Sequence, residues 1–561
     1  MPNIQREYTN KQTANVQQFI DELKAQAATK EGTFDSVAAE DYVEQASKAA
    51  QSKVPEELQA VLDECKDQTD SKRIVNAILD GVTMYEREHG CNVPADIVSQ
   101  AMHNAYGVTE DARTRYRDAM LDSAATANSL HAENLALQPN RAVISIISAF
   151  ASAIPWAAYL PADIGSNEAR LGILTHRAGE RAGMYAAGGV LDGIESGNPL
   201  LQASRTHTVN PDNNGAVSGK ITAFMTDMYH CDQTVDGVKL MRGRTIVYVS
   251  GYPVAFEVES SKGSGASAIS GNFELAGTAY TMAGSINTDS GVFALTTSPA
   301  LPASVEVAVE GFIDYERAPD VAARIIADVE VFKLFAKPFR AITQQTIDAA
   351  TQLGNEFGLD PMSESIVAIN TQFANERHYD ALAKGLRLAQ MNVHEFDYTV
   401  AAQHQDSSKP EVWRDLVHPL AAASQQMAED TMNHGISHIY VGKQVLAQLG
   451  ACAEIFQPSG LTDRPGIYRA GRLFGRFDVY YLPKLINETA TSSQIICAGR
   501  GTDVARNPIV LGDAVAPTVL PLRMDTDMRR GSAFYARNFT CVNPHKPSAR
   551  GFALINVLNM K

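Results

Sequence analysis

Residues 360–373 read DPMSESIVAINTQF and carry the clearest helix start in this 561-residue chain. Asp360 is placed to cap the first turn, and Pro361 occupies the first helical position, where its missing N–H costs little. Apolar residues then recur at steps of four, three and four, at Met362, Ile366, Ile369 and Phe373. The pattern continues for about 30 residues, which predicts a helix roughly 45 Å long. A helix of that length suits a spine along an elongated subunit.

The chain on either side of this start divides into helical and mixed stretches. Residues 330–391 as a whole are predicted to be helical, with the start at Asp360 inside them. A polar connector at 404–409 (HQDSSK) follows. Residues 411–561 then alternate between a helix ending near 433–435, a short helix at 444–449, and strands at 438–441, 477–482, 494–497 and 552–557. This alternation predicts a mixed α+β unit.

Residues 205–317 have the sequence pattern of β-strands. Alternating apolar positions occur at 246–249, 293–295 and 305–309, in a stretch where Gly, Ser and Thr are frequent. Turn signals stand at 212–215 (DNNG), 263–265 (GSG) and 289–291 (DSG). We therefore expect hairpins, at least one of them with a long polar tip.

Residues 1–135 are predicted to be several helices joined by short turns. Apolar residues lie three or four positions apart at 19–23 and again at 74–82, and Gly and Pro are sparse before Pro94. The run 142–160 (AVISIISAFASAIPWAAYL) has no charge over 19 residues. Pro155 inside it and its many small residues favour a buried segment of a soluble core over a membrane span.

Composition places the chain among folded globular proteins, since 45% of its residues are hydrophobic and 20% are charged. Its six cysteines form no C-x-x-C pair, which indicates neither a zinc ribbon nor a disulfide framework and fits a reducing compartment. The N-terminus, MPNIQREYTNKQ, is polar from the start. No signal peptide is expected, so the protein should stay in the compartment where it is made.

The net charge of −16 argues against a protein that coats nucleic acid over its whole surface. The charge is uneven, however. Residues 1–70 hold 14 Asp/Glu and 7 Lys/Arg, whereas residues 521–561 hold 7 Lys/Arg and two aspartates. The basic end could lie near packaged DNA or acidic neighbours, or it could be an ordinary solvated surface.

The motifs that carry nucleotide or hydrolytic chemistry are missing or defective. No G-x-S-x-G elbow occurs. Residues 215–221 (GAVSGKI) resemble a phosphate loop, but the glycine spacing is one short and Ile221 stands where Ser or Thr would hold magnesium. Residues 263–268 (GSGASA) match a relaxed dinucleotide fingerprint but precede no amphipathic helix, so a loop tip is expected.

The metal-capable and aromatic residues are predicted to be structural. His434 and His438 straddle Gly435, so helical i, i+4 ligation is not expected, and the neighbours 230–232 (HCD) point to opposite faces of a strand. The large aromatic residues lack interleaved basic residues and are expected to be core or interface anchors: Trp156, Trp413, Tyr468, Tyr480 and Tyr481. We expect no catalytic, cofactor-binding or metal-binding residues and no enzymatic activity.

The order of features from Pro139 onward resembles the major capsid proteins of tailed bacteriophages of the Hong Kong 97 type, especially those related to the T-even and very large contractile-tailed phages. Roughly three quarters of the chain takes part. The matching stretches, in order, are 286–325, 335–387, 437–442 (SHIYVG), 466–483 (GIYRAGRLFGRFDVYYLP), 508–522 (PIVLGDAVAPTVLPL) and 537–557. Each motif alone is weak, and the ordered series carries the resemblance.

The resemblance implies an α+β Hong Kong 97-like fold with a spine helix, an extended β-hairpin loop, a mixed axial domain and a helical N-terminal extension. The extended loop, expected at about 255–290, should reach a neighbouring subunit. It places these parts at 1–135 (N-terminal extension or arm), 136–204 (lead-in to the peripheral domain), 205–317 (extended-loop or insertion region), 318–410 (peripheral domain with spine helix), 411–525 (axial domain) and 526–561 (return strands of the peripheral domain). The extension could be retained or removed during maturation. No residue matches the family's covalent cross-linking chemistry.

The implied function is self-assembly into hexamers and pentamers that form an icosahedral phage head. The implied partners are further copies of the chain, portal and scaffold proteins, possibly decoration proteins, and double-stranded DNA held non-specifically on the inner face, with no membrane. The expected location is the virion shell, assembled in the host cytoplasm. Two alternatives stay open: the shell of an encapsulin-like cellular compartment, or a hydrolase with a β-rich binding insert.

Overall fold

The computed structural model describes residues 2–27, 36–48, 54–65, 68–121, 142–162, 167–258, 265–357, 361–401, 408–522 and 529–560. The chain separates into two units. Unit 1 comprises Met1–Ile173 and Val331–Lys561, and unit 2 comprises Leu174–Glu330. Helices and strands are both abundant, so the α+β class predicted from the sequence is confirmed.

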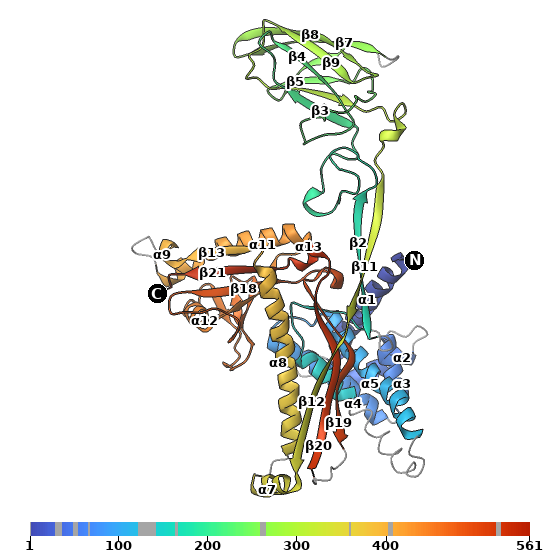
Figure 1. Cartoon of the computed structure of the whole chain (residues 1–561), viewed down its shortest axis with the longest axis vertical. Helices are drawn as coiled ribbons and strands as arrows, with labels where there is room; N and C mark the ends of the chain where they lie inside the picture. The colour runs from blue at the N-terminus through green and yellow to red at the C-terminus, as the bar shows by residue number, and fades with distance from the viewer. Residues whose placement is uncertain are drawn as a thin grey trace. The chain divides into compact units, whose positions relative to one another are not determined.

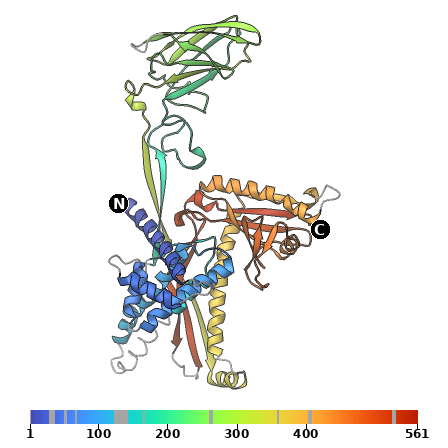
Figure 2. The same cartoon turned by 180° about the vertical axis from the view of Figure 1, so that it is seen from behind.

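The N-terminal part of unit 1 is helical, as predicted. Its helices are α1 (Pro2–Ala27), α2 (Ser36–Lys48), α3 (Glu56–Glu64), α4 (Gln68–His89) and α5 (Ala95–Leu121), drawn in blue in Figure 2. The apolar positions that predicted these helices are buried, among them Leu23 in α1 and Ile78 in α4. Helix α5 packs against strand β19, so this helical segment belongs to the core of unit 1.

The uncharged run 142–160 lies in the core of unit 1. Residues 142–151 are helical, and Ile146, Ile154 and Trp156 are fully buried. None of the described helices is long and apolar enough to cross a membrane. The buried-segment prediction is therefore confirmed.

A four-stranded sheet and a long helix form the centre of unit 1. The strands lie in the order β1 (Ala158–Tyr159), β19 (Ile509–Leu522), β20 (Arg529–Val542) and β12 (Lys337–Thr346). Helix α8 (Pro361–Ala389) has 29 residues and runs beside β12 and β20 (Figure 1). The long helix predicted from residue 361 is confirmed, whereas its predicted cap Asp360 lies outside the described residues.

The prediction of helix for the whole of 330–391 was wrong at its start. Strands β11 (Ile325–Phe335) and β12 occupy that stretch, and helix begins only with α7 (Ile347–Phe357). Two causes account for the difference. The sequence VEVFKLF at 329–335 alternates with β-branched and aromatic residues, which fit a pleated strand, and β12 forms a ladder with β20 along its whole length.

A seven-stranded sheet forms the C-terminal part of unit 1. Every strand and helix predicted within 411–561 is present there, including α11 (Val417–Thr431) and α12 (Lys443–Gly450). The strand order is β13 (Val393–Asp397), β21 (Phe552–Leu558), β18 (Ser493–Gly499), β14 (Ile436–Val441), β17 (Phe477–Tyr481), β16 (Tyr468–Leu473) and β15 (Phe456–Pro458). Shorter helices lie at α9 (Tyr398–Ala401), α10 (Lys409–Arg414) and α13 (Lys546–Ala549).

Unit 2 is β-rich, as predicted for 205–317. Its eight strands lie in the order β3 (Ser204–Val209), β10 (Val307–Phe312), β5 (Ile246–Val249), β6 (Tyr252–Glu257), β7 (Ala266–Leu275), β8 (Thr278–Asn287), β9 (Val292–Ser298) and β4 (Ala216–Lys220). The sheet curls so that its two end strands, β3 and β4, approach each other. Their closeness is shown by Gly219 in β4, where a Cβ would lie 2.9 Å from the ring of His207 in β3. Val217, Ile269, Met282 and Phe293 are buried inside the curl.

The hairpin expected within 255–290 is present, but it is not a free loop. Strands β7 and β8 pair along their full length and continue the sheet between β6 and β9. The extended two-stranded element of this protein is a different one. It consists of β2 (Glu168–Ala178) paired with β11, which together connect unit 1 with unit 2 along the chain.

Candidate assembly surfaces

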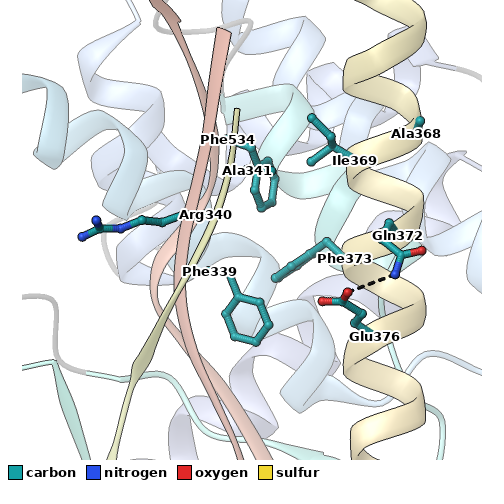
Figure 3. Close-up of a pocket in the computed structure, with 9 residues that line it drawn as sticks. All are labelled: Phe339, Arg340, Ala341, Ala368, Ile369, Gln372, Phe373, Glu376 and Phe534. Atoms are coloured by element: carbon teal, nitrogen blue, oxygen red, sulfur yellow. Dashed lines mark hydrogen bonds between the residues drawn. The ribbon is translucent and has the colours of Figure 1, made fainter. Parts of the chain in front are cut away.

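An apolar groove lies between α8 and the strands β12 and β20 of unit 1 (Figure 3). Its volume is about 420 Å³. The side chains that we call the apolar groove are Phe339 and Ala341 from β12, Phe534 from β20, and Ile369 and Phe373 from α8. Gln372 donates a hydrogen bond to Glu376 at 3.0 Å at its rim. A groove with apolar walls and a polar rim is the usual form of a docking site for an apolar side chain.

Local sequence patterns aim these side chains at one another. Alternation along β12 turns Phe339 toward α8, and the helical step of four puts Ile369 and Phe373 on one face of α8. The Phe373 ring centre lies 5.4 Å from those of Phe339 and Phe534. The Phe339–Phe373 contact is edge-to-face, a geometry that adds about 0.5–1.5 kcal/mol beyond area burial. Phe373 and Phe534 are almost fully buried, and Phe339 and Ile369 remain partly exposed, so these last two offer most of the contact surface of a preformed groove.

Strand β12 also exposes apolar surface and backbone. In the described sheet it is an end strand and pairs only with β20. On the side opposite the groove, Ile342 is 68% exposed. Proteins normally protect a long edge strand with charges, bulges or covering segments, because its unpaired N–H and C=O groups invite another chain. Arg340 and Pro338 give β12 only partial protection.

The part of β11 in unit 1 carries a second exposed apolar patch. Val331 and Phe335 are 60% and 61% exposed and lie four residues apart on one face of the strand. We call these two side chains the ribbon patch. It cannot enter the apolar groove of its own chain, because β11 leads directly into β12, which forms the wall of that groove. Lys333 lies between the two side chains on the same face and pairs with Glu168 of β2 at 3.6 Å, so the patch consists of two apolar side chains on either side of an ion pair. A two-stranded ribbon by itself is marginally stable in water.

A buried ion pair joins the N-terminal helices to the centre of unit 1. The guanidinium of Arg377 on α8 lies 2.8 Å from the carboxylate of Asp513 on β19, with both side chains almost fully buried. Asn104 on α5 donates to the other carboxylate oxygen at 2.9 Å, and Gln100 donates to Asn104. One carboxylate thus links a helix, a strand and the N-terminal segment.

A second buried carboxylate, Asp96 on α5, also joins the N-terminal helices to the rest of unit 1. Asp96 accepts a hydrogen bond from the guanidinium of Arg500 at 2.7 Å and another from the backbone N–H of Tyr159. Arg500 also donates to the carbonyl oxygens of Pro155 and Ala157. Removing α5 would leave a guanidinium and a backbone N–H without these partners, which is costly in a buried place.

Three histidines, of which His438 is buried and His89 and His378 are partly buried, lie around two stacked tyrosines at the contact between α4, α8 and the seven-stranded sheet. His89 lies 3.0 Å from the hydroxyl of Tyr480, and Nε2 of His378 lies 2.9 Å from the hydroxyl of Tyr440. Trp156 donates to the Tyr440 hydroxyl, so that hydroxyl can donate in turn to a neutral His378. Burial lowers the pKa of His89 to about 4, aided by Arg469, and lowers the pKa of His378 and of His438 to about 3.

This histidine cluster predicts that unit 1 loses stability in mild acid. The unfolded chain takes up protons near pH 6.5, but the folded chain keeps these imidazoles neutral until about pH 4–3. Each histidine should therefore cost about 1.4 kcal/mol per pH unit below 6.5. Denaturant unfolding at pH 7, 6 and 5 measures the slope. His378→Asn should lower this slope by the contribution of one histidine, and a slope equal to that of the unsubstituted protein would contradict the assignment.

The residues that the sequence motifs singled out do not converge on a reaction centre. Gly215 lies in a turn and Lys220 ends β4, while Gly263 and Ser264 lie outside the described residues and β7 follows them. His230 bonds to Asp227, Cys231 to backbone oxygens, and Asp232 to Arg181. Across the described ranges, no group of three or more His, Cys, Asp or Glu side chains could hold a metal ion.

The remaining flagged residues lie in the interior. His434 is buried in a loop and His438 on β14 contacts Ser437, so they occupy different elements. Trp156, Trp413 and Tyr480 are buried, which confirms their prediction as core anchors. Sequence reasoning missed Val331, Phe335 and Phe534. The alternation at 329–335 could have indicated the first two, but nothing local marks Phe534 as a groove residue.

No family model matches the chain, and no curated protein matches it. Solved structures from phages and from an encapsulin are similar to it. A protein of Microbacterium phage Oxtober96 shares 13% identity over 42% of this chain and 76% of its own, with a TM-score of 0.27. The SrpI encapsulin of Synechococcus elongatus PCC 7942 shares 11% over 41% and 77%, with a TM-score of 0.25. The capsid of Myoviridae phage XM1 shares 7% over 59% and 94%, with a TM-score of 0.28. Scores this low assign the chain to no family.

Proposed function

We propose that this chain is the shell-forming major capsid protein of a tailed bacteriophage with a Hong Kong 97-type fold. The proposal rests on the presence, on one chain, of two exposed apolar surfaces, the apolar groove and the ribbon patch. The apolar groove is lined mainly by apolar side chains, and Val331 and Phe335 of the ribbon patch are 60% and 61% exposed outside it. Each surface therefore needs a second copy, and in this proposal the ribbon patch of one copy docks in the apolar groove of the next.

This contact is heterologous, because it joins two different surfaces. Repeated heterologous contacts form closed rings whenever the rotation between neighbours divides a full turn. Rings of six and five copies are the capsomers of an icosahedral shell. Interfaces that are weak alone become strong in a ring, since each copy is held by both neighbours. The helix α8 and the four-stranded sheet correspond in this proposal to the peripheral domain, and the seven-stranded sheet to the axial domain.

The partners and location follow from this function. We propose that copies of the chain surround double-stranded DNA in the virion, with non-specific contact on the inner face, and that portal, scaffold and decoration proteins complete the head. We also propose that the described N-terminal helices stay in the mature subunit. The hydrogen bonds of Asp96 and Asn104 to buried groups support retention, because cleavage and release would break them.

Electron microscopy of the purified chain tests the proposed function. We expect closed shells to form as the subunit concentration rises. A monomer at all concentrations would contradict the proposal, and shells that enclose an enzyme rather than DNA would favour a cellular compartment.

A cysteine pair tests the docking itself. Val331→Cys combined with Gln372→Cys places one thiol on the ribbon patch and one at the groove rim. In assembled shells, oxidation should give a ladder of covalent oligomers that ends at five and six copies, while each single variant should give at most dimers. Shells without the ladder would show that the ribbon patch docks elsewhere.

A further inference from the structure

One face of unit 2 is exposed and carries charge only at two of its corners. It is formed by the outward positions of the neighbouring strands β7, β8, β9 and β4 (Figure 1). We call it the neutral face, and its residues are Ala268, Ser270, Asn272, Thr281, Ala283, Ser285, Ala294, Thr296 and Ser218. Their strand neighbours Ile269, Met282 and Phe293 point to the buried core. Every side chain of the neutral face is small or of moderate size.

The strand register places these side chains in rows that run across the four strands. Ser270, Ala283 and Thr296 lie side by side in one row, which Phe256 of β6 extends. Ala268, Ser285, Ala294 and Ser218 form the next row. Short side chains in regular rows allow a second sheet to approach to the usual spacing of about 10 Å. Phe256 is 52% exposed and adds an apolar contact at the margin.

The missing charge distinguishes this face from the rest of the chain. Residues 263–305 contain two charged residues, Glu274 and Asp289, whereas 20% of the whole chain is charged. The chain has a net charge of −16, so two copies repel each other over most of their surfaces. A charge-free face is the place where two such copies can meet at the smallest electrostatic cost. Depletion of charge is also the compositional mark of an interface core.

Two opposite charges at the corners of the neutral face indicate how the copies meet. Glu274 lies near the end of β7, and Lys220 ends β4 at the opposite end of the face, three strands away. They therefore occupy diagonal corners. A two-fold axis along the other diagonal places Glu274 of each copy opposite Lys220 of the other. In that arrangement the strands of the two sheets cross near a right angle, which is a common form of sheet packing.

From this geometry we propose that the neutral faces of two copies pack on each other about a two-fold axis through Ala283. The face measures about 20 Å by 20 Å from strand spacings and rises, so the contact buries roughly 800 Å² in total. Stable interfaces commonly bury about 1,200–2,000 Å². The contact is consequently too small to hold a free dimer, and it acts when many copies are already held in one particle, as the proposed function provides.

Cross-linking in assembled shells tests this contact. Ala283→Cys on β8 lies near the proposed axis and should give covalent dimers with a short bismaleimide, whereas Tyr229→Cys, on a loop outside the neutral face and 64% exposed, should not. In the Ala283→Cys background, Glu274→Lys should lower the dimer yield about tenfold, and so should Lys220→Glu, because each places like charges together. Combining both substitutions should restore the yield.

The outcomes separate this contact from the proposed function. Shells that form normally but give no Ala283→Cys dimers, or that join Ala283→Cys to a different polypeptide, would overturn the two-fold contact alone. Failure of the double charge swap to restore dimers would overturn the diagonal axis. Absence of shells by electron microscopy would overturn the proposed function and this contact with it.

Discussion

Replacing Phe335 by aspartate is expected to leave a folded subunit that no longer assembles. The side chain is 61% exposed in the single chain, so its loss should change the free energy of unfolding by no more than about 0.5 kcal/mol. In the proposed contact the same ring is buried against Phe339 and Phe373 of a neighbour. Losing that burial costs about 1.5–3 kcal/mol, and an unpaired carboxylate in an apolar groove costs more. Assembly should therefore require at least about 100-fold more subunit.

Light scattering across a concentration series measures the assembly threshold, and circular dichroism measures the fold. Met391→Asp is the matched control, because Met391 is 63% exposed but lies outside the ribbon patch and the apolar groove. Phe335→Leu should retain most assembly, since leucine still fills an apolar site. If Phe335→Asp assembles at the wild-type concentration, or if Met391→Asp fails equally, the ribbon patch is not an assembly contact.

The apolar groove shows how far the sequence alone reaches. Its helical wall was predictable, because a capping pattern and apolar residues at steps of four and three mark α8 and place Phe373 on its inner face. The strand wall of the groove was not predictable from the sequence. Phe339 was expected in a helix, since the pairing of β12 with β20 is set by residues about 190 positions further along the chain. The local sequence pattern of β12 does not indicate that β20 is its pairing partner.

The same limit applies to the N-terminal helices. Their helical state was predictable from apolar periodicity, and the buried positions of α1 and α4 confirm it. Their attachment to the rest of unit 1 was not predictable, because the hydrogen bond from Asn104 to Asp513 joins residues 409 positions apart in the sequence. A polar residue in a helix usually indicates a solvated face. Only the fold shows that Asp96 and Asn104 point into the core and make the helical segment part of unit 1.

Asp513→Ala is expected to destabilise unit 1 by about 3–5 kcal/mol, the usual cost of removing one partner from a buried ion pair. The substitution leaves the guanidinium of Arg377 buried without its carboxylate and removes the acceptor for the side chain of Asn104. Because this carboxylate joins α5 to α8 and β19, loosening of the N-terminal helices should accompany the loss. Denaturant unfolding measures the stability, and hydrogen exchange along α5 measures the loosening.

Glu454→Ala provides the matched control, since Glu454 pairs with Arg414 on the surface, where both side chains are more than half exposed. That change should cost no more than about 1 kcal/mol. N-terminal sequencing of the subunit from assembled particles completes the test, because helices held by Asp96 and Asn104 should still be present. A wild-type unfolding midpoint for Asp513→Ala would show that this carboxylate does not anchor α5. A mature subunit that begins after Leu121 would show that the helices are released, because the buried bonds of α5 would then have to break during maturation.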